Sequence, residues 1–146
     1  MPENAKRTPV EIMITYLKEV GGEGRYDLID EIAHEDMVDE ANLAFGGPPG
    51  RAGLVDHVKG FHANITETTS DVHNIVGGGD QVMAHWSFRG RHSGPWLGRP
   101  PTGEMISANV FSFFTLKDGL ISRYRLWMCA EMDEVVIFDS SNPAGR

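Results

Sequence analysis

The sequence has little of several features that would define a function at once. Cysteine occurs once in 146 residues, at Cys129, which excludes an internal disulfide and is typical of a chain kept in a reducing compartment. No apolar run approaches the roughly 18 residues of a membrane span. The first residues, MPENAKRTP, contain no apolar core of a signal peptide. We therefore expect a cytoplasmic protein with no membrane partner.

Signatures of metal, nucleotide and nucleic-acid binding are also missing. Six histidines are present, but neither HExxH nor CxxC occurs, so no metal site is predicted. No phosphate-binding loop of the GxGxxG or GxxxxGK[ST] type occurs, and the glycines at 77–79 indicate a hairpin turn. With 13 basic and 21 acidic residues the net charge is −8, which argues against a nucleic-acid partner.

The order of the predicted elements is helices first and strands afterwards. Thr8, Pro9 and Glu11 form a capping box with proline at the first helical position, and the apolar spacing after it ends at Gly21. Residues 26–33 and 51–66 predict two further helices; residues 37–38 between them are extended or helical. From Asp71 the pattern alternates, which predicts an antiparallel meander including strands at 81–90, 105–116 and 119–128. This order is typical of an α+β domain, which we place at residues 1–138, with a disordered polar tail at 139–146.

Alternation divides the side chains of these strands into two faces. The even-numbered face is almost wholly apolar and should meet the helices. Its members include Ala84, Trp86, Phe88, Val110, Ser112, Phe114, Tyr124, Leu126 and Met128. The odd-numbered face mixes arginines with large rings: Arg89, Arg123 and Arg125 with Phe111, Phe113 and Trp127. Aromatic and arginine side chains are enriched in subunit interfaces, so we expect this outer face to pair with another subunit.

Three segments carry a recognisable pattern. They are GRAGLVDHVKGF, GGGDQVMAHWSFRGRHSGPWLGRPPTG and FFTLKDGLISRYRLW, of which PPTG and DGLI are the specific parts. Together they resemble the SnoaL-like polyketide cyclase family of the nuclear transport factor 2-like superfamily, over residues 14–128. The resemblance implies a cone of curved antiparallel sheet closed by three N-terminal helices around a deep apolar pocket. It also implies a homodimer through the outer sheet face, and no metal or organic cofactor.

The resemblance further implies an acid/base pair in the pocket, and here this sequence departs from the family. The family's second-strand position falls on Ser112, and the aspartate of its HWD motif falls on Leu126. The histidine of that motif falls on Tyr124, and the HD that often comes after the second helix falls on Glu40 and Ala41. The usual acid/base pair is therefore expected to be replaced.

A cyclase without that pair favours a reaction that needs no proton transfer. Positioned acid/base groups typically contribute about 10²–10⁴-fold to a rate, and a pericyclic ring closure (a cycloaddition) does without them. Such a catalyst folds a flexible polyene or polyketide in a shaped apolar cavity. Tyr124, Ser112 or Tyr16 is expected to donate a hydrogen bond to a carbonyl. The substrate-binding residues predicted on this hypothesis are Trp86, Phe88, Ala84, Phe114, Val110, Leu126, Met128 and Glu40.

Two alternatives stay open. One is an acid/base aldol cyclase, hydratase or isomerase that uses His34, Asp36 or Glu40. The other is a non-catalytic ligand-binding or assembly module of the same fold. His57 and His62, which flank the apolar face of the third helix, are interpreted as solvated or capping side chains rather than as functional groups.

Overall fold

A computed structural model of the chain describes residues 7–143. The helical elements are α1 (Pro9–Ile14), η2 (Thr15–Gly21), η3 (Tyr26–Leu28), α2 (Ile29–Ile32), α3 (Glu40–Ala44) and α4 (Arg51–Asn64). The predicted capping box is confirmed, because the Thr8 hydroxyl accepts from the Glu11 amide and the Glu11 carboxylate accepts from the Thr8 amide. The first helix continues without interruption from α1 into the π-helical segment η2. None of these helices of residues 7–143 has the length and apolar content needed to cross a membrane.

One curved sheet holds all the strands of the described residues. They are β1 (Ala33–Asp39), β2 (Ile65–Gly78), β3 (Gln81–His92), β4 (Met105–Lys117), β5 (Leu120–Glu131) and β6 (Val135–Asp139). Strands β2 to β5 form the predicted antiparallel meander. β1 runs parallel to the first half of β5, and β6 runs antiparallel to the second half. The sheet is therefore mixed, which corrects the purely antiparallel expectation.

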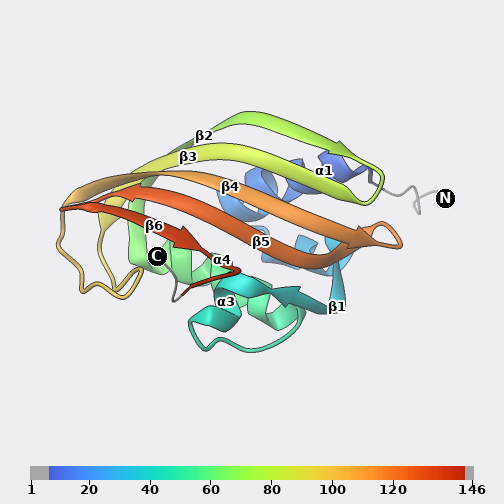
Figure 1. The fold of residues 1–146 in the computed structure, drawn as a ribbon, viewed down its shortest axis with the longest axis horizontal. Coiled ribbons are helices and arrows are strands. Elements are labelled where there is room, and N and C mark those ends of the chain that lie inside the picture. The colour runs from blue at the N-terminus through green and yellow to red at the C-terminus, as the bar shows by residue number, and fades with distance from the viewer. Residues whose placement is uncertain (1–6, 144–146) are drawn as a thin grey trace.

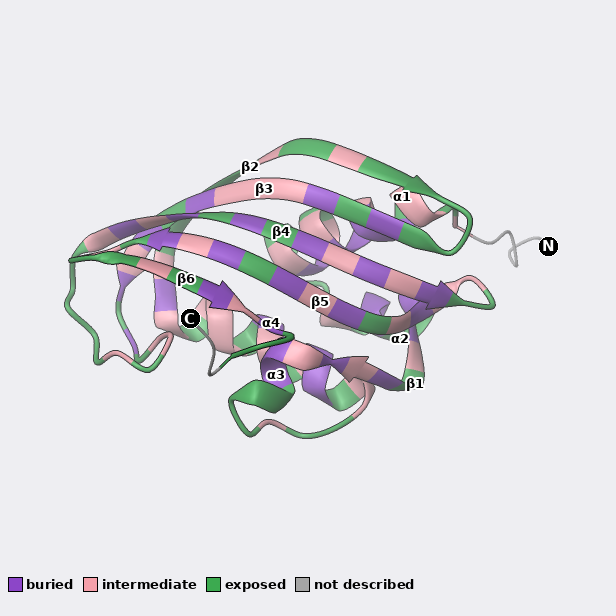
Figure 2. Cartoon of the chain, viewed as in Figure 1, coloured by how far each residue is buried: buried purple, intermediate pink, exposed green. Residues whose placement is uncertain are grey.

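The helices lie together on one side of the curved sheet (Figure 1). This confirms the α+β class and the cone-like arrangement, in which the concave side of the sheet holds the core. Along β3 to β5, buried residues alternate with more exposed ones (Figure 2). The predicted inner face is buried, with one change of register: β5 carries an extra residue opposite Thr115 and Leu116, and this bulge turns Ile121 into the core.

The C-terminal stretch corrects the expected tail boundary. Asp139 ends β6, and the next residue, Ser140, is 5% exposed. The Ser140 hydroxyl accepts a hydrogen bond from the Leu126 amide at 2.9 Å, and its own amide donates to the Leu126 carbonyl at 3.0 Å. Residues 139–143 are thus part of the folded unit, while residues 144–146 lie outside the described residues.

Candidate active site

A cavity of about 330 Å³ opens between α3 and α4 on one side and the inner face of β3 to β5 on the other. The β3–β4 loop and β6 complete its rim. Most of its lining is apolar, with Asn42, Asp56, His57 and Asn64 as the polar members. The apolar members are Ala41, Phe45, Gly60, Phe61, Trp86, Pro95, Trp96, Leu97, Gly98, Val110, Leu126, Met128 and Phe138. Such a space suits a neutral organic molecule that is oriented by a few polar contacts.

Helix α4 supplies one wall of the cavity from a single stripe. His57, Gly60, Phe61 and Asn64 succeed each other at three- and four-residue spacing, so they share one face of the helix. Along the axis the first and last of them are about 10 Å apart. Gly60 leaves that wall open, because a Cβ built on it would meet nothing within 4 Å.

Of the polar residues that line the cavity, His57 is paired with the buried carboxylate of Asp39, which is not itself part of the lining. The His57 Nδ1–H donates to Asp39 Oδ2 at 2.7 Å, and the other carboxylate oxygen accepts from the Asn42 amide at 3.1 Å. Asp39 is the last residue of β1 and the N-cap of α3, and its side chain is only 1% exposed. Both of its oxygens are thus fixed by the fold, and so is the orientation of the His57 ring.

The electrostatics of this pair favour a proton-transfer role. Burial lowers the pKa of His57, but the charge and hydrogen bond of Asp39 outweigh it, so that the pKa is raised above its ordinary value. Asp56 adds to the rise. A carboxylate only accepts hydrogen bonds, so it holds the proton of the neutral ring on Nδ1 and leaves the lone pair on Nε2. The side chain is 23% exposed and lines the cavity, so this nitrogen is available to a bound molecule.

The ring of Tyr124 packs against the ring of His57. The two rings are stacked, with centroids 5.6 Å apart and planes within 8°. Tyr124 is 2% exposed, and burial is the main cause that raises the pKa of its phenol. Tyr16 packs edge-on against Tyr124 at 5.5 Å and is also buried, which again raises the pKa of the phenol. These rings stay neutral and set the position of the imidazole.

Four of the predicted substrate-binding residues line the cavity: Trp86, Val110, Leu126 and Met128. Phe88, Ala84 and Phe114 are buried in the core and do not form part of the lining. Phe88 lies directly behind the lining, because its ring packs edge-on against Phe61 and Trp96, which both line the cavity.

The three residues predicted to donate a hydrogen bond to the substrate, Tyr124, Ser112 and Tyr16, lie beneath the cavity floor instead. The Trp86 indole N–H donates to Ser112 Oγ at 3.0 Å, and Ser112 Oγ lies 2.9 Å from the Tyr124 hydroxyl. A serine hydroxyl can accept two hydrogen bonds, so either hydroxyl can be the donor in this second contact. The hydroxyls are therefore used within the protein, where they hold the Trp86 ring in the cavity wall.

Glu40 is placed by the structure in a structural contact rather than in the cavity. Its carboxylate receives Arg123 Nε at 2.7 Å, Ser141 Oγ at 2.7 Å and Ser140 Oγ at 3.1 Å. Its neighbours in the acid/base alternative lie elsewhere: Asp36 is exposed on β1, and His34 Nε2 lies 2.6 Å from the Lys117 carbonyl at the β4–β5 turn. None of these three side chains lines the cavity.

Sequence reasoning interpreted His57 as a solvated or capping side chain and did not consider Asp39. The two residues are 18 positions apart and form no spacing motif. The available signal was weak: Asp39 directly precedes Glu40, to which the resemblance draws attention, and it has the residue type of a helix N-cap. Helix α3, which this cap begins, was not predicted.

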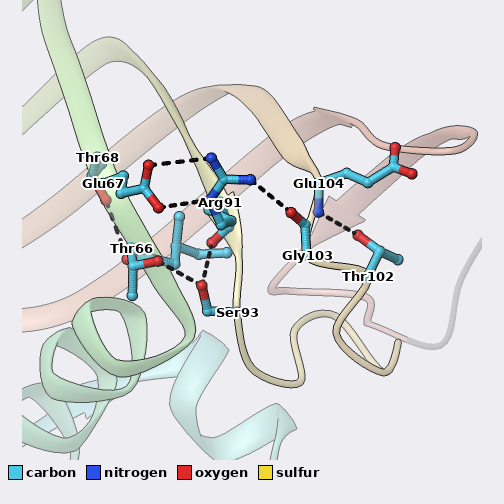
Figure 3. A network of polar contacts seen from close by, with 9 residues as sticks. Thr66, Glu67, Thr68, Arg91, Ser93, Thr102, Gly103 and Glu104 are labelled. Carbon is cyan, nitrogen blue, oxygen red and sulfur yellow. Dashed lines mark hydrogen bonds and ion pairs between the residues drawn. The ribbon is translucent and has the colours of Figure 1, made fainter.

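The β3–β4 loop that forms part of the rim is anchored at both ends (Figure 3). At its start the hydroxyls of Thr66 and Ser93 lie 2.5 Å apart. At its end Arg91 donates to the Gly103 carbonyl at 2.8 Å while its other nitrogens bind both oxygens of Glu67, at 2.6 and 3.2 Å. A loop held in this way presents a defined surface to the cavity.

The site offers little to a metal ion. Within residues 7–143 no group of three or more His, Cys, Asp or Glu side chains is arranged to hold one. The histidine–carboxylate pair and the apolar walls are the chemical means that these residues provide.

Fold and cavity define a class: small α+β proteins whose curved sheet and helices enclose an apolar pocket. Comparison with known proteins identifies the family within it. The family model of the SnoaL-like polyketide cyclases matches residues 11–129, and the chain belongs to that family. It is 33% identical over 107 residues to nogalonic acid methyl ester cyclase of Streptomyces nogalater, covering 71% of this chain and 78% of that protein.

Solved structures agree with this assignment. TsrD from Streptomyces laurentii superposes with a TM-score of 0.67 at 23% identity, covering 80% of this chain and 84% of that one. IdmH from Streptomyces antibioticus superposes with a TM-score of 0.63 at 26% identity, covering 85% of this chain and 92% of that one. At this level of identity the likeness to TsrD shows the shared fold.

Proposed function

We propose that this protein is a polyketide cyclase that closes a ring by acid/base catalysis, with His57 as the proton-transfer group and Asp39 as its partner. The observation that carries the proposal is the pairing of Asp39 with His57, whose side chain lines a largely apolar cavity. A carboxylate behind an imidazole is an arrangement that fixes the tautomer of a general base. The bound substrate is held between that base and the aromatic walls.

The proposed reaction is an intramolecular aldol addition. Nε2 of His57 removes a proton from a carbon next to a carbonyl, and the resulting enolate carbon attacks a second carbonyl of the same chain. The alkoxide then takes the proton back from the imidazolium, whose charge Asp39 stabilises. One C–C bond forms, one C–H bond becomes an O–H bond, and no oxidant or reductant is consumed. Asn64, about two helical turns from His57, is a donor that suits the second carbonyl.

The cavity walls contribute by holding the chain folded. Near-attack geometry can lower a barrier by several kcal/mol, up to about 7–11 in bimolecular comparisons. Trp86, Phe61 and Leu126 provide flat and branched apolar surface, and the missing side chain at Gly60 provides room. The family description, a polyketide cyclase, supports this class of substrate, and the name of the Streptomyces nogalater relative, nogalonic acid methyl ester cyclase, supports ring closure on a methyl ester.

The test uses nogalonic acid methyl ester as the first trial substrate, and polyketide methyl esters of other shapes after it. The wild type is expected to accelerate ring closure over buffer with a pH-dependent rate. His57→Gln should lose about 10²–10⁴-fold in kcat, with little change in KM. Binding without turnover, with every substrate tried, would instead identify a non-catalytic ligand-binding module.

A second candidate is the pericyclic closure that the sequence favoured, without a cofactor. Its premise was that the chain lacks an acid/base pair, and the pairing of His57 with Asp39 weakens that premise. The largely apolar lining still favours it, because such a reaction needs little beyond shape. A rate that is independent of pH and unchanged in His57→Gln, measured with a polyene substrate, would select this candidate over the first.

We further propose that the outer sheet face pairs with a second copy of the chain. Two rows of neighbouring side chains across β3 to β5 on this face support the pairing. One row consists of His85, Phe111 and Trp127, and the other of Met83, Phe113 and Arg125. Trp127 is 45% exposed, and Ile137 on β6 adds a 70% exposed side chain beside it. Light scattering should give a dimer mass for the wild type and a monomer mass for Trp127→Glu; a monomeric wild type would contradict the pairing.

A further inference from the structure

A tight hairpin in the β3–β4 loop forms part of the cavity rim. Trp96 and Arg99 exchange two backbone hydrogen bonds of 3.0 Å each, so only Leu97 and Gly98 form the turn between them. Both central residues are left-handed, with φ of 51° at Leu97 and 75° at Gly98. These are the features of a type I′ turn, whose first central position is normally asparagine, aspartate or glycine.

Leucine is an unusual residue at this position. Its Cβ makes the left-handed conformation unfavourable, and nothing in its side chain compensates by local hydrogen bonding. The backbone persists in it because the surroundings fix the hairpin. The Trp96 ring packs edge-on against Phe88 at 5.6 Å, and Arg99 forms an ion pair with Glu134 in the β5–β6 turn. The clamp of Arg91 on Gly103 holds the end of the same loop (Figure 3).

The strained side chain faces the space that the proposed substrate occupies. Leu97 is partly buried, packs against the core and lines the cavity on the rim supplied by the loop. Backbone strain kept in place by its surroundings is a feature found at ligand clamps and active sites. A turn residue chosen for the turn alone would have no reason to be apolar.

We infer that Leu97 is a specificity-determining residue, an apolar cap that retains an apolar part of the substrate in the cavity. This inference rests on the proposed polyketide site but not on the role of His57. The cap is a fixed one: the hairpin presents Leu97 in its left-handed conformation, and the side chain slows the release of the bound molecule.

Two variants separate the effect of the Leu97 side chain from the effect of the backbone strain. Leu97→Ala removes the cap and keeps the strain, whereas Leu97→Gly removes both. The matched controls are Asp118→Ala and Asp118→Gly, because Asp118 has φ of 53° in the β4–β5 turn, at the other end of β4 and outside the cavity lining. The probe is 1,8-dihydroxyanthraquinone, a neutral tricycle whose binding is monitored by quenching of tryptophan fluorescence, since Trp86 and Trp96 line the cavity.

Stopped-flow dissociation should be about tenfold faster in both Leu97 variants, the factor expected when most of the apolar contact of one leucine is lost. Both Asp118 variants should release the probe at the wild-type rate. Leu97→Gly should melt at a higher temperature than Leu97→Ala, because glycine relieves the left-handed strain. Wild-type release rates in both Leu97 variants would overturn the cap, and equal melting temperatures would overturn the strain.

The two proposals fail in different ways. No quenching with the wild type would overturn both the cap and the cavity as a polyketide site. Faster release from the Leu97 variants, combined with full turnover by His57→Gln, would leave the cap standing and refute the acid/base function.

Discussion

Replacing Asp39 with asparagine keeps the shape of the side chain and removes its charge, and the surrounding geometry predicts the effect on His57. The capping oxygen accepts from the Asn42 amide, and an introduced amide can do this only with its carbonyl oxygen. The NH₂ group must then face His57 Nδ1, 2.7 Å away in the wild type. A ring nitrogen that accepts from an NH₂ group carries no proton, so the proton moves to Nε2. The nitrogen that faces the substrate thus ceases to be a base.

The expected loss in kcat for Asp39→Asn is therefore that of a misdirected general base, about 10²–10⁴-fold. This corresponds to roughly 3–5 kcal/mol of transition-state stabilisation. KM should change little, because the apolar walls are untouched. The charge-assisted hydrogen bond to His57 is also lost, which should lower the free energy of unfolding by about 1–3 kcal/mol. That loss leaves an ordinary domain folded.

The assay is steady-state ring closure, with folding checked by circular dichroism and denaturant titration. Asp36→Asn is the matched control, since it removes the same charge from an exposed position three residues earlier on β1. It should stay within about twofold of the wild type, as expected for an exposed charge away from the cavity. An Asp39→Asn protein that is folded and turns over at the wild-type rate would refute the reasoning about the tautomer.

Three further predictions concern the cavity wall, the pH dependence and the C-terminal contact. Gly60→Leu should abolish substrate binding, because the new side chain fills the open part of the cavity wall. Gly60→Ala should raise the free energy of unfolding by up to about 1 kcal/mol in a denaturant titration. An unchanged substrate affinity in Gly60→Leu would contradict the assigned pocket. The pKa of His57 is raised in the folded state, so its protonated form stabilises the fold. This contribution is complete below the pKa of the unfolded state, about 6.5, and is lost as the pH rises through the pKa of the folded state. Between these two pKa values the wild type should therefore lose more free energy of unfolding than His57→Gln. Parallel curves would contradict the pairing with Asp39. Glu40→Gln should lower the free energy of unfolding by about 1–3 kcal/mol in urea, because Arg123 loses its carboxylate partner and Ser141 loses its charged acceptor. An unchanged midpoint would show that this contact contributes nothing.

Local patterns were enough to predict most of the fold. The capping box at Thr8, the glycine stops and the two-residue alternation act over a few positions and specify their own conformation. β1 and α3 were not predicted as such, because β1 pairs in parallel with β5, some 85 residues later, and α3 is five residues long. β6 was missed for a similar reason: its pairing with the second half of β5 leaves no local signal beyond a short apolar run.

The cavity was predicted better than the chemistry. Alternation alone places Trp86, Val110, Leu126 and Met128 on the inner face, and these residues do line the cavity. It does not distinguish a lining residue from one in the layer behind. Ser112 and Tyr124 were therefore expected in the pocket, on this face and at positions where the family resemblance implies acid/base groups. The pairing of Asp39 with His57 depends on the position of α3 against α4, and no pattern in a single sequence encodes that contact.

The most direct test of the central claim is chemical rescue of His57→Ala by imidazole. The substitution empties the place of the ring beside Asp39, and a free imidazole fits into the widened cavity. We predict that the variant loses at least about 10²-fold in ring closure and that added imidazole restores much of that rate in a saturable manner. Rescue should be absent when Asp39→Asn is combined with His57→Ala. A His57→Ala protein that closes the ring at the wild-type rate without imidazole would contradict the claim that this side chain transfers the proton.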